Sequence, residues 1–188
     1  MTAFRPAFLS ILLALSVAAC GDQSVRYLLD APAAQERVSL RVRTIEVRDV
    51  TLPDYASGSG IMIQGEDGAL RPAAKAVWAD DPVRAVTLSL ARDLEAVSTA
   101  RAAAEPWPLF DPAQVRLEVR IDRMVAQDEG TFRLAGQFSI AAPQGVVRES
   151  LNRFDISQPL SAQTPSAVAE ATSAAILSLA GQIAARLR

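Results

Sequence analysis

The 188-residue sequence contains no histidine, a single cysteine and a single lysine. Histidine is the usual general base, the usual member of a catalytic triad and the commonest metal ligand, so its absence argues against all three kinds of site. One cysteine supplies no redox pair of thiols. The sequence therefore gives no support to a histidine-dependent hydrolase, a soft-metal protein or a dithiol oxidoreductase.

Positive charge is also scarce. The formal net charge is −2, and the arginines are scattered among acidic residues. Binding to nucleic acid needs a basic surface, so we expect no nucleic-acid partner. Half of the residues are hydrophobic, which is enough for the core of one ordinary domain and argues against wholesale disorder.

The N-terminal stretch has the layout of an export signal. Arg5 precedes an apolar run from Ala7 to Val17, and small residues follow, as in a secretory signal peptide. The sequence Val17-Ala18-Ala19-Cys20 resembles the lipobox of bacterial lipoproteins. We interpret residues 1–19 as a lipoprotein signal peptide and Cys20 as the site of lipid attachment, carrying acyl chains of the palmitate type.

Two other interpretations of this stretch are possible. A transmembrane anchor needs roughly 20 apolar residues, whereas this run has about 11 to 13. An ordinary secretory signal would leave Cys20 as an unpaired thiol in an exported protein. Gly21, and not aspartate, follows Cys20, which by the best-studied sorting rule favours the periplasmic face of the outer membrane over the inner membrane.

Residues 20–36 are interpreted as the lipidated N-terminus and a tether, and residues 37–188 as one folded domain. About 16 fully extended residues reach roughly 50–60 Å. A short edge strand at Tyr27–Leu29 would shorten that reach.

Hydrophobic patterning predicts the elements of the domain. Expected strands cover residues 38–50 (with a bulge near Arg43-Thr44), 61–63, 69–78, 115–125, 132–140 and 146–156, and residues 54–60 are expected to be a loop. The predicted architecture is an α+β single domain, with a mostly antiparallel or mixed sheet and two helices packed on one face.

Two helices carry start signals. Asp80-Asp81-Pro82 begins the first, which fades over residues 98–104, and Thr164-Pro165 begins the second. Trp78 is expected to be buried against the first helix, and Asp93 to lie off its buried stripe. The predicted buried positions are Val83, Val86, Leu90, Leu94 and Val97 in the first helix, and Val168, Thr172, Ile176, Leu179, Ile183 and Leu187 in the second.

We find no residue pattern that calls for catalysis, a cofactor or a metal. Ser57-Gly58-Ser59-Gly60 does not have the spacing of a nucleophile elbow. The acidic pair Asp80-Asp81 is explained by helix capping, and Asp128-Glu129 by a hairpin turn. We therefore predict a protein that is not an enzyme.

An ordered set of features resembles the ABC-transport auxiliary lipoproteins (PqiC/YmbA-like). After the lipobox come Tyr27-Leu28-Leu29-Asp30, a strand leading into Pro53-Asp54-Tyr55, then Ile61-Met62-Ile63, and Trp78-Ala79 before a helix that starts with acids and a proline. The later hairpin and the alanine-rich last helix also fit. Tyr55 is followed by Ala56, where the family more often has a bulky apolar residue.

The resemblance implies a non-enzymatic outer-membrane lipoprotein that serves an ABC or MCE-domain lipid transport system and supports membrane integrity. Its partners would be inner-membrane subunits, and several copies would form a homo-oligomer, such as a ring. The alternative is a periplasmic lipoprotein that binds a small ligand or acts in envelope assembly without a transporter. An apolar pocket of about 300 Å³ or more would favour that alternative.

The anchor can be tested directly. Because Cys20 is the sole thiol and ends the lipobox, Cys20→Ala should abolish lipidation. Mass spectrometry of the wild-type protein should show an N-terminal Cys20 bearing acyl chains. A mature protein that begins at Gly21 or Asp22 without lipid would contradict the lipoprotein interpretation.

Overall fold

A computed structural model of the chain describes residues 23–30 and 36–188, which form the predicted α+β fold. The signal peptide, Cys20 and residues 31–35 lie outside the described residues. The strands are β1 (Val25–Tyr27), β2 (Thr44–Val47), β3 (Gly60–Gln64), β4 (Leu70–Trp78), β5 (Arg101–Ala104), β6 (Val115–Gln127), β7 (Thr131–Ala141) and β8 (Ser150–Pro159). The helices are α1 (Asp54–Ser57), α2 (Pro82–Val97) and α3 (Pro165–Arg186).

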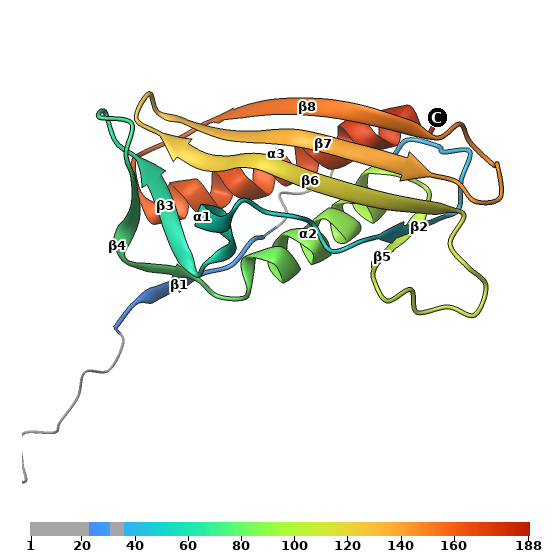
Figure 1. The fold of residues 1–188 in the computed structure, drawn as a ribbon, viewed down its shortest axis with the longest axis horizontal. Helices are drawn as coiled ribbons and strands as arrows, with labels where there is room; N and C mark the ends of the chain where they lie inside the picture. Colours follow the sequence, from blue (N-terminus) through green and yellow to red (C-terminus); the bar gives the residue numbers. More distant parts are fainter. Residues whose placement is uncertain (1–22, 31–35) are drawn as a thin grey trace, which may run out of the picture.

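The hairpin of β6 and β7 is the centre of the sheet (Figure 1). In the first part of β6, alternate residues such as Val115, Leu117 and Val119 are buried and those between them are exposed, as the sequence pattern predicts. Strand β8 continues the antiparallel pairing on the far edge of β7. These three long strands form one wide, curved surface.

The other edge of β6 is shared by two groups of strands. At one end β2 pairs with it in parallel, through Ile45 and Val115, and β5 extends the sheet beyond β2. At the other end β3 pairs with it at Ala126, followed by β4 and β1. The sheet is therefore mixed, and its two ends are built from different parts of the chain.

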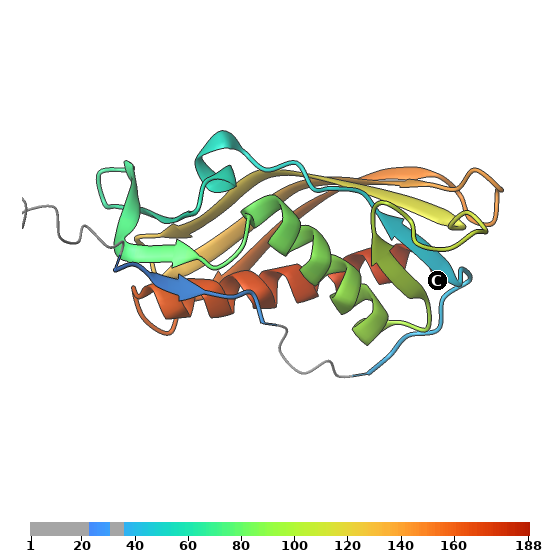
Figure 2. The same cartoon turned by 90° about the horizontal axis from the view of Figure 1, so that it is seen from below.

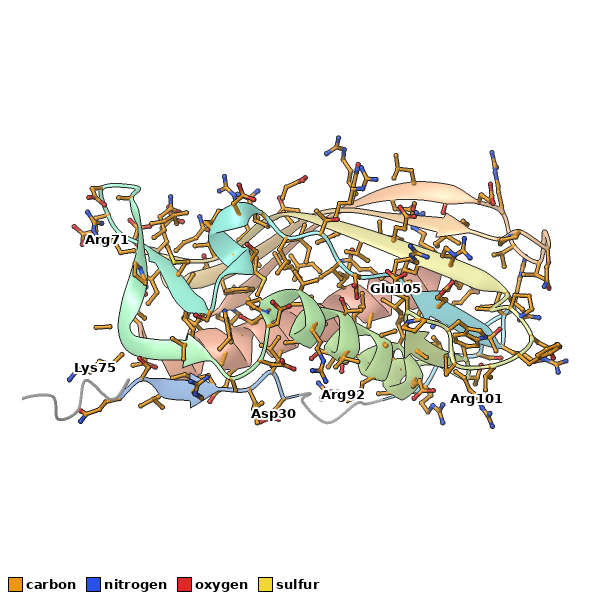
Figure 3. The ribbon with its side chains drawn as sticks, turned by 60° about the horizontal axis from the view of Figure 1, so that its bottom comes forward. Asp30, Arg71, Lys75, Arg92, Arg101 and Glu105 are labelled. Carbon is orange, nitrogen blue, oxygen red and sulfur yellow. The ribbon has the colours of Figure 1, made fainter. Side chains whose placement is uncertain are left out.

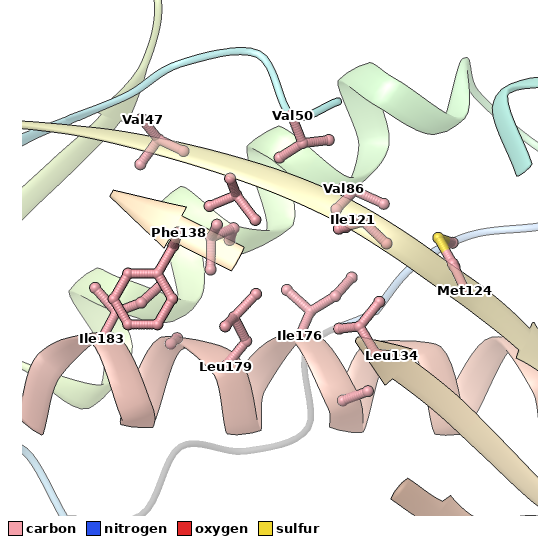
Figure 4. Close-up of a cluster of buried hydrophobic side chains, with 14 of the residues drawn as sticks. Val47, Val50, Val86, Ile121, Met124, Leu134, Phe138, Ile176, Leu179 and Ile183 are labelled. Atoms are coloured by element: carbon pink, nitrogen blue, oxygen red, sulfur yellow. The ribbon is translucent and has the colours of Figure 1, made fainter. Parts of the chain in front are cut away.

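Helices α2 and α3 lie on the same face of this sheet (Figure 2). The predicted stripe of α3 is confirmed, because Val168, Thr172, Ile176, Leu179, Ile183 and Leu187 are each at most 1% exposed. Figure 4 shows Ile176, Leu179 and Ile183 directed toward the apolar side chains of β6 and β7. The length and hydropathy of α3 would suffice for a membrane span, but 67% of its most apolar stretch is buried, as in a core helix.

The start of α2 follows the predicted capping. The Asp81 carboxylate accepts a 3.0 Å hydrogen bond from the Arg84 backbone N–H, and Pro82 occupies the first turn. Trp78, at the end of β4, is only 6% exposed, so its predicted burial is confirmed. The neighbours that share its small pocket, Met124, Phe132 and Val168, come from the sheet and α3 and not from the predicted stripe of α2.

The predicted strand at residues 38–50 is wrong in extent, since only Thr44–Val47 form a strand. The residues before it bond to helix ends. Val38 N–H donates to Val97 O at 2.8 Å, and Arg41 N–H donates to Leu187 O at 3.1 Å. The bulge predicted near Arg43-Thr44 is not found in the pairing of β2. An irregularity of this kind lies in β6, where the pairing with β7 skips a residue between Ile121 and Arg123.

Two short elements were also mispredicted. The expected loop at 54–60 contains helix α1, whose Tyr55 hydroxyl accepts a 3.0 Å hydrogen bond from Met124 N–H. The expected fading helix at 98–104 contains β5, an alanine-rich strand held by parallel pairing to β2. Neither segment has a strong local preference for its conformation, so tertiary hydrogen bonds decide it.

An N-terminal edge strand was predicted as an option at Tyr27–Leu29, and one is present two residues earlier, at Val25–Tyr27. Val25–Tyr27 pair in parallel with β4, and Ala79 N–H donates to Tyr27 O at 2.8 Å. Leu29 is buried, and Arg92 Nη2 donates to its carbonyl oxygen at 3.3 Å. The sheet therefore begins within the segment interpreted as a tether, five residues after Cys20.

Asp93 contradicts its predicted exposed position. It is 1% exposed, and neither carboxylate oxygen has a hydrogen-bond partner among the described residues. The nearest cation is Arg92, whose Nε lies 3.6 Å from Oδ1. Burial raises the pKa of Asp93, and the attraction of Arg92 offsets part of that shift. Asp93 thus lies on the buried side of α2 at a cost in folding stability.

Replacing Trp78 should destabilise the fold. Truncating a buried tryptophan costs about 3–5 kcal/mol, out of a typical total of about 5–15 kcal/mol. Trp78→Ala should therefore lower the urea midpoint strongly. Trp107→Ala is the control, because Trp107 is only half-buried and should matter less. An unchanged midpoint for Trp78→Ala would mean that the Trp78 side chain adds nothing to the core.

Replacing Asp93 should have the opposite effect at neutral pH. The pKa of Asp93 is raised in the folded state. As the pH rises above 3.8, the carboxyl group therefore ionises in the unfolded chain while it is still protonated in the folded chain. Folding stability falls with rising pH until the folded-state pKa is passed. Asp93→Asn removes this loss and should stabilise the protein by about 1–3 kcal/mol at pH 7. Near pH 3 the two proteins should unfold alike. Lower stability of the variant at pH 7 would contradict this account.

Candidate functional site

The serine and acidic candidates raised by the sequence have structural roles. The Ser57 hydroxyl donates to Asp54 O at 2.9 Å within α1, and Asp81 caps α2. Asp128 and Glu129 are exposed at the β6–β7 turn. Among the described residues, no group of three or more Cys, Asp or Glu side chains could hold a metal ion. The lipid site at Cys20 stays a prediction, because it lies outside the described residues.

One end of the molecule presents exposed apolar side chains, which we call the distal tip: Leu109, Phe110 and Val146. Phe110 is fully exposed, Leu109 is 51% exposed and Val146 is 37% exposed. They lie on loops 105–114 and 142–149, at the end of the long axis opposite to β1 (Figures 1 and 2). The loops border a surface groove of about 590 Å³, lined by Arg43, Thr44, Trp107, Leu109, Phe110, Asp111, Pro112, Gln114 and Gln144.

Both ends of loop 105–114 are bonded to the segment that contains β2. Glu105 pairs with Arg48 at 2.9 Å and accepts a 2.7 Å hydrogen bond from Asp49 N–H. Gln114 N–H donates to the Thr44 hydroxyl at 2.9 Å. Within the loop, Trp107 Nε1 donates to the carbonyl oxygen of Asp111 at 2.8 Å. The exposed phenylalanine is therefore carried on a braced loop, which reduces the ordering needed for binding.

The distal tip was not predicted from the sequence. Its loop follows residues 98–104, the expected fading end of a helix, and Leu109 and Phe110 were given no role. The available signal was three large apolar residues, Trp107, Leu109 and Phe110, in a proline-containing stretch without strand or helix periodicity. Such residues in a loop favour a binding surface.

A second groove, which we call the proximal groove, lies between the start of the chain and α3. Its volume is about 480 Å³, and it is lined by Arg26, Tyr27, Leu28, Asp30, Ser166, Ala169, Glu170, Ser173 and Ala174. In Figure 3, Lys75 and Arg71 mark this end of the domain, and Arg101 lies toward the distal end. Both grooves are larger than the 300 Å³ set for a ligand pocket, but both open at the surface and charged residues line both, so neither is the wholly apolar pocket of that criterion.

The face of the sheet not covered by α2 and α3 is different in character. It carries charged side chains, and two pairs of them meet across neighbouring strands. Arg133 and Asp155 form two hydrogen bonds, at 2.8 and 2.5 Å, and Arg116 pairs with Glu46 at 2.9 Å. The Arg133 guanidinium lowers the pKa of Asp155 below its ordinary value. This face is therefore charged, whereas the distal tip is apolar and uncovered.

Comparison with solved structures supports the fold. Protein XCC0632 from Xanthomonas campestris superposes with a TM-score of 0.68 at 16% identity, covering 87% of this chain and 95% of that one. A crystal structure of an uncharacterized protein gives a TM-score of 0.66 at 16% identity, covering 85% and 100%. A comparison with curated proteins finds no match.

The family assignment comes from the sequence as a whole. The model of the ABC-type transport auxiliary lipoprotein components matches residues 27–184, from the end of β1 almost to the end of α3. The match thus covers the sheet except for Val25 and Arg26, α2 and nearly all of α3, and the lining of both grooves except for Arg26. This confirms the resemblance inferred from the ordered motifs, and the chain belongs to the family of ABC-type transport auxiliary lipoprotein components.

Proposed function

We propose that this protein is a non-enzymatic outer-membrane lipoprotein, anchored through Cys20, that docks an inner-membrane ABC or MCE-domain subunit and supports membrane integrity. The family match supports an accessory role in ABC transport. The outer membrane, the MCE-type partner and the lipid on Cys20 are parts of the proposal. Self-association of several copies is a further part of it.

The proposed anchor holds the domain close to the membrane. Val25, the first residue of β1, is five positions after Cys20, so the connection spans at most about 18 Å when fully extended. The end of the domain that contains β1 therefore stays near the lipid headgroups. This is a much shorter connection than the 50–60 Å expected for a tether of about 16 residues.

The observation that carries the proposal is the position of the distal tip. An anchor at the β1 end leaves the tip with Leu109 and Phe110 at the far end of the domain, where a partner from the opposite membrane can reach it (Figure 1). Exposed aromatic residues in a well-braced loop are typical of binding hot spots. Anchoring raises the effective concentration of such a partner, so a small apolar contact is sufficient.

A second candidate function rests on the proximal groove. Its volume of about 480 Å³ is in the range of small-molecule sites, which supports a lipoprotein that binds a ligand without a transporter. A ligand site and a docking tip can coexist, because they lie at different ends of the domain. Genomic association with an MCE-domain gene would favour the docking role.

Replacing the tip should separate docking from folding. The double variant Leu109→Ser/Phe110→Ser should reduce partner recovery after crosslinking in cells at least about tenfold, because the aromatic contact is lost. Its melting temperature should stay close to that of the wild type, since both side chains are exposed. Cells that carry it should become sensitive to detergents, as cells lacking the gene should.

The matched control is Leu70→Ser, which removes a side chain 36% exposed at the start of β4, at the end of the domain opposite to the tip (Figure 1). It should leave partner recovery and detergent resistance unchanged. If the wild-type protein recovers only soluble periplasmic enzymes, and deletion leaves the permeability barrier intact, the proposed function is wrong. Equal partner recovery by the tip variant and the wild type would place the interface elsewhere.

A further inference from the structure

The proximal groove contains charged side chains of both signs that do not pair. Arg26, Asp30 and Glu170 line the same groove and are exposed. None of these three side chains forms an ion pair or a side-chain hydrogen bond with another residue in the described ranges 23–30 and 36–188. Arg133 and Asp155, in contrast, form an ion pair between β7 and β8. The groove therefore offers one cation and two carboxylates whose charges the fold does not use.

Between these charges the groove is apolar. Tyr27 and Leu28 line it on one side, and Ala169 and Ala174 of α3 on the other. Leu28 lines the groove, yet 64% of its surface is exposed to solvent. The alanines leave room that a larger side chain on α3 would occupy. The groove can therefore accept an apolar chain along α3.

The walls of the groove are held in place. Tyr27 is paired to Trp78 through the β1–β4 register, and Arg92 binds the carbonyl oxygen of Leu29. On the other side, the Ser173 hydroxyl donates to Ala169 O at 3.1 Å and is turned back onto its own helix. The lining is thus preorganised by contacts that do not use Arg26, Asp30 or Glu170, which are left for a ligand.

We propose that the proximal groove binds one zwitterionic phospholipid. Its phosphate lies at Arg26, its headgroup ammonium lies at Asp30 and Glu170, and an acyl chain lies against Leu28 and the alanines of α3. A guanidinium matches a phosphate through charge-assisted hydrogen bonds, and carboxylates match an ammonium in the same way. An anionic lipid without an amine would meet two carboxylates without compensation, so the groove discriminates against it.

The source of this lipid is the membrane next to the domain. That part of the proposal rests on the proposed anchoring, since Arg26 is six residues after Cys20 and within about 22 Å of it when the chain is extended. Lipid binding itself requires neither the anchor nor a transporter partner. The site therefore adds a lipid-holding role to the docking role proposed above.

The test uses the full mature protein, reconstituted with vesicles of equal parts phosphatidylethanolamine and phosphatidylglycerol, and then analysed by native mass spectrometry. The wild type should retain one phosphatidylethanolamine per chain in preference to phosphatidylglycerol. Arg26→Gln should lower retention of both lipids roughly tenfold, because both carry a phosphate. Asp30→Asn/Glu170→Gln should remove the preference between them, because only phosphatidylethanolamine carries an amine.

The controls are Arg153→Gln and Glu118→Gln, which change exposed charges on the outer face of the sheet and should leave retention unchanged. Retention of no lipid, equal retention of both lipids by the wild type, or equal loss in the control variants would overturn the proposal. Since no partner takes part in this assay, lipid retention by a protein that fails to recover a transporter subunit would contradict the docking role alone. A protein without acyl chains on Cys20 can be measured in the same way.

Discussion

The packing of α3 against the sheet is the contact on which the rest of the structure depends. Twelve residues of this helix are buried, and it contacts β7, β8, α2 and β1. Without it, buried side chains on the inner face of β6 and β7, such as Ile121, Leu134 and Phe138, would lose the helix that covers them (Figure 4). Each such side chain contributes about 1.5–3 kcal/mol when buried. The proximal groove also depends on α3, since one of its walls is the first half of that helix.

The parts of the fold that the sequence predicted are those where local pattern and tertiary environment agree. Period-two alternation predicted the β6–β7 hairpin, and the cap at Asp81-Pro82 predicted the start of α2. The edge strand β1 was within reach because Tyr27 and Leu29 are apolar beside a polar N-terminal segment. The family resemblance was also available from the order of the motifs. In each case a few neighbouring residues contain the necessary information.

The errors arose where distant contacts decide the conformation. Strand β5 is built from alanines and exists because β2 lies beside it, and residues 38–43 bond to the ends of α2 and α3 instead of to a strand. Asp93 looked like a solvent-facing residue because its burial depends on what packs against α2, which periodicity alone does not show. The distal tip and the proximal groove each combine segments far apart in sequence, so no local motif could reveal them.

The shortness of β1 has a mechanical consequence. A load between the partner and the lipid anchor proposed above would pass into the sheet through Val25–Tyr27, a three-residue edge strand with one neighbouring strand. The long strands β6 to β8 share the same load over many more hydrogen bonds. Tension would therefore peel β1 away from β4 before it disturbs the core. Detachment of β1 would lengthen the connection to the membrane and remove Arg26, Tyr27 and Leu28 from the groove, so tension along the molecule would release whatever that groove holds.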